Sequence, residues 1–464
     1  MANFFKENTK KSVKTQEKQM LTVKVEKLDL NGCGVAYYKK KPVFINGSLP
    51  NERIETQLIE QKNKYARGKL LTISQVNENR ITPKCSHFSF CGGCDLQHLN
   101  YEQQLIFKKN KVIELFSRSG MAADIIAALP WQKPIAASQW HYRRKARIGV
   151  QFDKNAQATI GFRQKATNQL VAVKSCPVLV KPVDRIFPIL KELVAKLSVK
   201  KSIGHIEVIC TDISNQLSNH LTLVIRQVRT INAHDSQLWQ EYAHNNNWDI
   251  HFQCDENNNK NILNDTDDLN YGLIDDIQIN FSFNDFIQIN HSVNLAMVEQ
   301  ALSWLQPEST DQILDLFCGL GNFSLPLAKK VAKVIGVEGV QSMVDKAGAN
   351  ARFNKMDNCH FFQTDLNSDW LANEKLNKWV NNKFNKVLLD PARAGAELAI
   401  KQVEKLAIQT VLYVSCEPTT LARDSQFLLS KGYEIEKIGL IDMFSQTKHV
   451  ETMVLFKRKC KRKL

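Results

Sequence analysis

Cys416 lies in the stretch VSCEPTTLARD, directly after the apolar run Thr410–Val414, which reads as a buried strand. Open α/β sheets bind their ligands at the carboxyl ends of the strands, so this thiol is predicted at the edge where chemistry takes place. A structural cysteine would more often stand among the valines, as a small core residue. We therefore interpret Cys416 as a catalytic nucleophile.

Glu451, 35 residues further on, follows another late strand and is the predicted partner of Cys416. Alone it would be read as a surface carboxylate. A thiol and a carboxylate are together the minimum set for methylating carbon 5 of uracil, which is a poor nucleophile by itself. A thiolate adds to carbon 6, carbon 5 then attacks a methyl donor, and a base removes the carbon 5 proton so that the thiol can leave.

The stretch ILDLFCGLGNFSLPLA is predicted to be a strand that turns through Gly319 and Gly321 into a helix. Glycines let the backbone approach a ligand closely. Glu338 ends the next predicted strand, where a carboxylate can hold ribose hydroxyls, and Asp365 ends the third, near an adenine edge. The dinucleotide motif G-x-G-x-x-G is absent. The turn instead resembles the S-adenosylmethionine site of class I methyltransferases, and the alternative is an unliganded α/β domain.

The stretch KVLLDPARAG places Asp390 at a strand end before a proline, which holds the preceding residue extended and directs the carboxylate into the cleft. Methyltransferases that act on exocyclic amines commonly have an aromatic residue shortly after this position, where it stacks on the base. Ala392 and Arg393 stand there instead. This argues against methylation of an exocyclic amine.

Three clustered cysteines, Cys85, Cys91 and Cys94, are followed at a distance by Cys176, which precedes a proline. Structural zinc usually has two paired C-x-x-C hooks, whereas three clustered thiolates with one distant thiolate before proline favour a [4Fe–4S] cluster. Zinc, with His87 or His98 as a ligand, remains an alternative, and free thiols are a third.

The order of predicted elements gives an α/β fold class, with a doubly wound sheet that follows two further domains in the chain. The resemblance of the glycine turn implies that this is a class I methyltransferase sheet. Residues 1–17 are predicted to be a disordered basic tail. Short alternating strands over 18–78 indicate an oligonucleotide-binding-like barrel, and a mixed α/β central domain with the cysteine loop occupies 79–278. It includes a helix from Tyr101 to about Arg118, with Leu105, Val112, Leu115 and Phe116 on its apolar face, and an exposed loop at 255–270. Strand–helix repeats over 279–464 predict a doubly wound parallel sheet whose last two strands pair antiparallel.

The chain has 464 residues, a net charge of +15 and a pI near 9.2. Such an excess of positive charge favours a nucleic-acid partner over a merely solvated basic surface. No apolar run approaches the roughly 20 residues of a membrane helix, and the N-terminus lacks the apolar region of a secretory signal. We therefore expect a cytoplasmic protein without membrane contact, and a monomer.

In combination these motifs resemble the RNA (uracil-5-)-methyltransferases, particularly the branch that acts on 23S ribosomal RNA. The resemblance covers nearly the whole chain, with a TRAM barrel, the cysteine loop, WHYRRKARIG, FIQIN, DPARAG, SCEPTTLARD and DMFSQTKHVE. The barrel and the cluster argue against the transfer-RNA branch. By matching motif, the resemblance implies S-adenosylmethionine contacts at Gln288, Phe317, Asn322, Glu338, Asp365 and Asp390. It also implies [4Fe–4S] ligands at Cys85, Cys91, Cys94 and Cys176, a nucleophile at Cys416 and a base at Glu451.

Three positions depart from the family pattern. Glu417 replaces the usual asparagine after the nucleophile and is expected to raise the thiol pKa if it faces the sulfur. Ser445 replaces a proline and is expected to loosen its turn, and Asp365 stands where some members have asparagine. The alternatives are the same chemistry on another ribosomal or transfer-RNA uridine, or a non-catalytic RNA-binding assembly factor. A cytosine-5 methyltransferase is disfavoured, because the RNA enzymes of that kind use a second cysteine.

Overall fold

The computed structural model describes residues 19–211, 220–254, 269–372 and 378–459. The predicted tail at 1–17 lies outside these residues, as does nearly all of the loop predicted at 255–270. The chain divides into two compact units, Met1–Thr82 with His98–Asn100, and Pro83–Gln97 with Tyr101–Leu464. Among the described residues, none of the helices is both long and apolar enough to cross a membrane.

The first unit is a six-stranded sheet in the order β1-β5-β6-β4-β3-β2. Its strands are β1 (Met20–Lys24), β2 (Lys27–Leu28), β3 (Gly34–Tyr38), β4 (Lys41–Ile45), β5 (Arg53–Gln61) and β6 (Ala66–Gln75). Alternate residues such as Val23, Ile45 and Ile54 form its core, as period-two patterning requires. Leu71 is 41% exposed, contrary to the predicted alternation, because register shifts between β5 and β6 change which side chains face inward.

A two-residue turn, Lys39–Lys40, joins β3 to β4, and both residues are exposed with positive φ. This backbone suits the right-handed twist of a hairpin but is normally filled by Asn-Gly. Lysines in such a position place two positive charges at the tip of the hairpin.

The second unit contains a six-stranded sheet in the order β12-β11-β10-β7-β8-β9 and a hairpin, β13-β14. The sheet strands are β7 (Lys145–Phe152), β8 (Ala158–Arg163), β9 (Leu170–Ala172), β10 (Ile203–Cys210), β11 (Leu221–Gln227) and β12 (Trp248–Cys254), and the hairpin strands are β13 (Leu269–Gly272) and β14 (Gln278–Phe281). The helices of this part are α1 (Tyr101–Arg118), α2 (Ala123–Ala127), α3 (Lys181–Asp184), α4 (Ile186–Lys196) and α5 (Ala233–Asn246). Side chains of α4 and α5 pack on the sheet in one apolar core.

The C-terminal part is a seven-stranded sheet in the order β17-β16-β15-β18-β19-β21-β20. Its strands are β15 (Gln312–Leu316), β16 (Lys333–Glu338), β17 (Cys359–Gln363), β18 (Lys386–Leu389), β19 (Thr410–Ser415), β20 (Tyr433–Ile441) and β21 (Glu451–Arg458). The first five pair in parallel, and β21 pairs antiparallel with both β19 and β20. The predicted doubly wound sheet with an antiparallel closing pair is confirmed.

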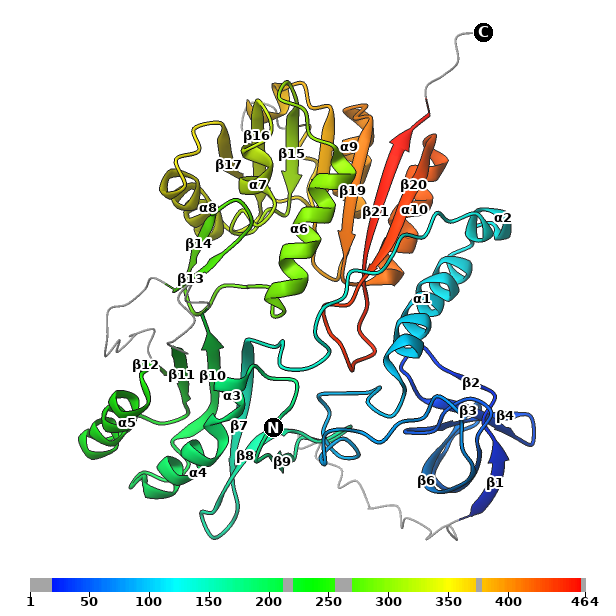
Figure 1. Ribbon diagram of the computed structural model, residues 1–464, viewed down its shortest axis with the longest axis vertical. Coiled ribbons are helices and arrows are strands. Elements are labelled where there is room, and N and C mark those ends of the chain that lie inside the picture. The colour runs from blue at the N-terminus through cyan, green and yellow to red at the C-terminus, as the bar shows by residue number, and fades with distance from the viewer. Residues whose placement is uncertain (1–18, 212–219, 255–268, 373–377, 460–464) are drawn as a thin grey trace, which may run out of the picture. The chain divides into compact units, whose positions relative to one another are not determined.

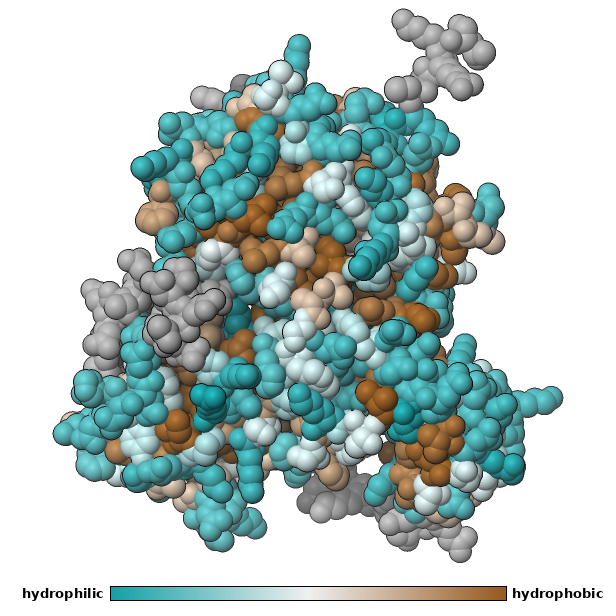
Figure 2. Space-filling view, viewed as in Figure 1, coloured by the Kyte–Doolittle hydropathy of each residue, from teal (hydrophilic) through white to brown (hydrophobic). Residues whose placement is uncertain are grey.

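Helices cover both faces of this sheet (Figure 1). They are α6 (His291–Leu305), α7 (Ser324–Ala328), α8 (Gln341–Phe353), α9 (Glu397–Lys405) and α10 (Pro418–Ser430), with a 3-10 turn at Lys378–Asn381. Ile313 packs in a core with α6 and α7, whereas its neighbour Leu314 packs in the opposite core with α9 and α10, because successive strand residues face opposite sides. Hydrophobic residues are seen mainly among the helices over this sheet, and the rest of the face in Figure 2 is predominantly hydrophilic.

Helix α1 has the predicted bounds, but its buried face differs from the prediction. Gln104, Lys108, Val112 and Phe116 are buried at spacings of four residues, while Leu105 and Leu115 are only partly buried. Val112 and Phe116 join the core with α10, so α1 packs on the C-terminal sheet part.

Candidate active site

The strand ends bring most of the predicted site residues to one edge of the seven-stranded sheet. In sheet order they are Asp365 after β17, Glu338 ending β16, Phe317 after β15, Asp390 after β18, Cys416 after β19 and Glu451 beginning β21. The chain order reverses between β15 and β18, which is where open α/β sheets bind ligands. Adjacent strands lie about 4.8 Å apart, so the row from Asp365 to Cys416 spans roughly 19 Å. An extended ligand can therefore contact both ends of the row.

The turn after β15 is built on backbone that side chains rarely adopt. Phe317 has φ +62° and donates its N–H to Val337 O at 2.9 Å, and Gly319 and Gly321 have φ +54° and +94°. The space in front of Gly319 is open, since an added Cβ would meet no atom within 4 Å. Left-handed backbone beside open space is typical of a ligand-binding turn.

Glu338 braces this turn from the neighbouring strand. Its Oε2 accepts the Gly319 N–H at 3.2 Å and its Oε1 accepts the Gly339 N–H at 2.8 Å. Asp365, two strands from β15, is exposed and accepts the Asn367 N–H at 2.9 Å. Both carboxylates are oriented by backbone donors at the edge of the sheet.

Asn322 and Gln288 lie on the α6 side of the turn. Asn322 exchanges two hydrogen bonds with Asn294 of α6, at 2.9 and 3.0 Å. Gln288, three residues before the start of α6, is buried, and its carbonyl accepts from Arg144 Nε at 2.9 Å. These bonds join the glycine turn, the start of α6 and the WHYRRKARIG segment.

Cys416 and Glu451 face each other across neighbouring strands. Ser415 pairs with Thr452 in the antiparallel β19–β21 ladder, so continuing the register by one residue sets Cys416 opposite Glu451. Glu451 is 6% exposed, and its burial, followed by the charge of Asp390, raises its pKa to about 8, while Lys108 lowers it. Burial and the charges of Glu451 and Asp390 raise the pKa of the Cys416 thiol to about 11, and Arg393 opposes them.

Asp390 completes this end of the row. Burial raises its pKa to about 7. The Asp390, Cys416 and Glu451 groups interact electrostatically, and each ionises more readily when a positive charge is brought beside it. The arrangement therefore suits a cationic reactant with a nucleophile and a base next to it.

Glu417 does not act as the sequence led us to expect. Its carboxylate accepts the Thr419 N–H at 3.2 Å and caps the N-terminus of α10. The acidic groups that raise the pKa of the Cys416 thiol are Glu451 and Asp390. The glutamate therefore still supplies a side-chain oxygen to the first turn of α10, as asparagine would, although asparagine is the more common N-cap residue.

Ser445 likewise tightens the turn that it was expected to loosen. It is 1% exposed, and its Oγ donates to Asp442 Oδ2 at 2.5 Å. The hydroxyl supplies a bond to a buried carboxylate that proline could not make.

The four predicted metal-ligating cysteines are free thiols in one neighbourhood of the second unit. The charges of Cys85, Cys91 and Cys176 each act on the Cys94 thiol, whose pKa is raised to about 12 mainly by burial. The Gly93 N–H points at Cys91 Sγ at 3.4 Å. Within the described ranges, as the side chains stand, no three or more Cys, His, Asp or Glu side chains form a group that could hold a metal ion.

Sequence reasoning missed several buried ionisable residues. Asp315 lies inside β15 and accepts from Ser324 Oγ at 2.5 Å, and burial raises its pKa to about 7. Lys108 and Asp442 form an ion pair in which both side chains are 1% exposed. The signal available for Lys108 was its spacing of four from Val112, which puts it on the buried stripe of α1.

The strand order, the glycine turn and the acid that ends the second strand of the sheet define a class I S-adenosylmethionine-dependent methyltransferase. Residues 100–459 match the tRNA (uracil-5-)-methyltransferase family, and residues 14–71 match the TRAM domain. The chain belongs to the tRNA (uracil-5-)-methyltransferase family.

Several relatives are similar over nearly their full length. The 23S rRNA (uracil(1939)-C(5))-methyltransferase RlmD of Colwellia psychrerythraea is 56% identical, with 98% of this chain and 99% of the relative covered. The protein of the same name from Psychromonas ingrahamii is 43% identical over 98% of this chain and all of the relative. Among solved structures, the Pyrococcus abyssi tRNA (uracil-54, C5)-methyltransferase in complex with S-adenosyl-L-homocysteine has a TM-score of 0.72 at 22% identity, covering 94% of this chain and 99% of that chain. This last likeness shows the fold alone.

Proposed function

We propose that this enzyme methylates carbon 5 of a specific uridine in 23S ribosomal RNA, using S-adenosylmethionine. The observation that carries the proposal is the placement of Cys416 opposite Glu451 beside Asp390, in a chain 56% identical to an RlmD protein. The reaction needs one thiolate and one carboxylate base, and these two residues supply them.

In the proposed reaction Cys416 and Glu451 supply the nucleophile and the base for each step. The Cys416 thiolate would add to carbon 6 of the flipped-out uracil. Carbon 5 of the resulting enolate would then take the methyl group from the sulfonium donor, whose methyl–sulfur bond breaks to leave a neutral thioether. Glu451 then removes the carbon 5 proton, the carbon 5–carbon 6 double bond re-forms, and the carbon 6–sulfur bond breaks to return the thiolate. The bound sulfonium donor supplies the methyl group and a positive charge that favours the ionised forms of the neighbouring acids.

The remaining sheet-edge residues are proposed to hold the methyl donor. Glu338 would bind the ribose hydroxyls and Asp365 the adenine edge, while Asp390 would lie beside the reacting methyl group. Gln288, Phe317 and Asn322 would complete the pocket. The open space before Gly319 supports this assignment, because the ligand can approach the backbone there.

The RNA is proposed to contact basic surface on the domains that precede the catalytic domain in the sequence. We assign residues 18–78 to an RNA-binding TRAM barrel, 79–278 to a central domain and 279–464 to the methyltransferase domain. The exposed Lys39–Lys40 tip and the net charge of +15 support RNA binding, since phosphate contacts dominate nucleic-acid affinity. A cytoplasmic monomer without membrane contact fits this role.

Cys85, Cys91, Cys94 and Cys176 are proposed to bind a [4Fe–4S] cluster. Each thiolate would ligate a different iron, so the four sulfurs can stand farther apart than the ligands of a single ion. The mutual charge effects of the thiols support a shared site, as does the Gly93 N–H at Cys91 Sγ, because such donors stabilise cluster sulfurs. Methyl transfer consumes no electrons, so the cluster would have a structural role.

A map of methylated uridines tests the proposed function. 23S ribosomal RNA from cells that lack the protein should miss one 5-methyluridine, and the wild-type gene should restore it. Cys416→Ala should not restore it, although the variant still binds the RNA. Methylation by the Cys416→Ala enzyme, or an unchanged map in the deletion strain, would contradict the proposal.

A further inference from the structure

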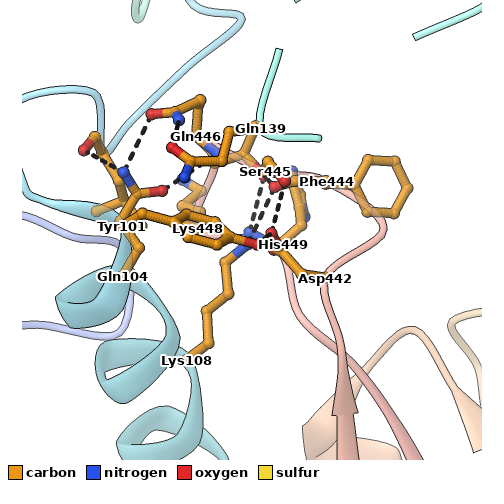
Figure 3. Close-up of polar contacts among 12 residues, drawn as sticks. Tyr101, Gln104, Lys108, Gln139, Asp442, Phe444, Ser445, Gln446, Lys448 and His449 are labelled. Carbon is orange, nitrogen blue, oxygen red and sulfur yellow. Dashed lines mark hydrogen bonds and ion pairs between the residues drawn. The ribbon is translucent and has the colours of Figure 1, made fainter. Parts of the chain in front are cut away.

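The loop between β20 and β21, Asp442–Val450, leads directly into Glu451 and is packed inside the protein. Asp442, Ser445, Gln446 and Thr447 are each at most 6% exposed. A buried loop must satisfy its polar groups within the protein. In the β20–β21 loop these partners come largely from α1 (Figure 3), and also from Asp95 and Leu96 at the end of the cysteine loop.

Lys108 of α1 is the charged anchor of the β20–β21 loop. Its Nζ lies 2.5 Å from Asp442 Oδ1 and donates to Phe444 O at 3.0 Å. Tyr101, about two turns earlier on the helix, and Ser445 both donate to Asp442 Oδ2, at 2.7 and 2.5 Å. One helix therefore fixes the start of the loop at two of its residues.

The middle of the loop is held by a second set of bonds. Asp95 and Leu96 donate their N–H groups to Gln446 O at 2.9 and 3.0 Å, and the Lys448 N–H donates to Asp95 Oδ2 at 3.1 Å. Gln104 of α1 donates to both Leu96 O and Gln446 Oε1. The cysteine loop, α1 and the β20–β21 loop thus form one hydrogen-bonded unit that ends at Glu451.

A buried lysine–aspartate pair is a poor source of stability, because apolar residues of similar size often serve as well or better. Stability alone therefore does not explain the Lys108–Asp442 pair. Lys108 lies close enough to Glu451 for its charge to act on that carboxylate. Lys108 lowers the pKa of Glu451, whereas burial and the charge of Asp390 raise it.

We propose that Lys108, through its ion pair with Asp442, is a positioning residue that holds Glu451 in place for removal of the carbon 5 proton. The inference rests on the proposed function, in which Glu451 accepts that proton as the carbon 6–sulfur bond breaks. Lys108 itself exchanges no proton with the substrate. It fixes the loop before Glu451, and its charge favours the carboxylate form that can accept the proton.

The test separates formation of the adduct from its breakdown. With 5-fluorouridine RNA and S-adenosylmethionine, adduct formation requires Cys416 but not proton removal, because carbon 5 carries fluorine. With uridine RNA, slow proton removal should leave a methylated, denaturation-resistant protein–RNA complex. Lys108→Met should form the fluorouridine adduct within about twofold of the wild-type rate, but turn over uridine RNA at least roughly tenfold more slowly, since base catalysis contributes about 10²–10⁴-fold. The methylated complex should accumulate.

Lys109→Met is the matched control, because Lys109 lies on the same helix and its Nζ lies over the Trp131 ring, 5.1 Å from the centroid. It should behave as wild type. Because Lys108→Met leaves a buried aspartate without its cation, the double variant Lys108→Met/Asp442→Asn provides a second test without an uncompensated charge. It should show the same accumulation.

Glu451→Gln and Cys416→Ala in the same assay distinguish a failure of the proposed function from a failure of the positioning role of Lys108. Methylation by Cys416→Ala would remove the proposed function itself. If Glu451→Gln stalls at the methylated complex while Lys108→Met or the folded double variant turns over normally, the positioning role of Lys108 is wrong. Equal loss of adduct formation and breakdown in the Lys108 variants would also overturn it, because that is a general structural effect.

Discussion

Replacing Glu451 with glutamine should stabilise the protein while removing its base. Burial raises the pKa of Glu451 from 4.5 to about 8. Between these two pH values the folded state keeps a proton that the unfolded chain has lost. The resulting loss of folding stability, the penalty for burying this carboxyl group, is absent below pH 4.5, grows as the pH rises and is complete above about 8. At about 1.4 kcal/mol per pKa unit the full penalty is roughly 4–5 kcal/mol. Glutamine, which cannot ionise, avoids it.

The assay is thermal unfolding of the full chain without ligands at several pH values. The second unit holds about 380 residues, for which the unfolding entropy is roughly 0.8 kcal/mol/K, so 4 kcal/mol corresponds to about 5 °C. Glu451→Gln should melt at the same temperature as wild type at pH 4.5 and about 5 °C higher at pH 8.5. Asp390 titrates in both proteins, so it largely cancels in the difference. Equal melting temperatures at pH 8.5 would refute the claim that the carboxylate is buried at a cost.

Two further predictions concern residues outside the Cys416–Glu451 pair. Glu417→Ala should destabilise α10 by about 1 kcal/mol through loss of its N-cap. The pH dependence of Cys416 alkylation should stay within half a pH unit of wild type; a larger downward shift would mean that Glu417 faces the sulfur. Anaerobically purified protein should contain about four iron and four sulfide per chain. Cys94→Ser should lower both and the control Cys33→Ser neither, whereas stoichiometric zinc would favour the alternative ligation.

The C-terminal sheet could be predicted closely because its local signals agree. Short apolar runs ended by acids or glycines alternate with helical segments, and the run Thr410–Val414, predicted as a buried strand, lies within β19 (Thr410–Ser415). In such a fold the strand ends meet at one edge, so spacing along the chain was enough to expect Asp390 and Cys416 together. The register that sets Cys416 opposite Glu451 needed the structure.

Side-chain pairing over long sequence distances could not be predicted. Lys108 and Asp442 are 334 positions apart, and a lysine is almost never fully buried unless paired, so α1 was assigned an apolar face that includes Leu105. The role of Glu417 depended on where one carboxylate points, which the sequence does not determine. Ser445 was judged by the proline it replaces, and not by the hydrogen bond it makes.

The covalent bond between Cys416 and the RNA tests the account most directly. The wild-type enzyme, S-adenosylmethionine and a 23S ribosomal RNA fragment with 5-fluorouridine at the target position should give a denaturation-resistant complex. Mass spectrometry after digestion should find the methylated fluorouracil nucleotide attached to the peptide that contains Cys416. Absence of a stable complex under conditions where uridine RNA is methylated, or attachment at another residue, would contradict the mechanism.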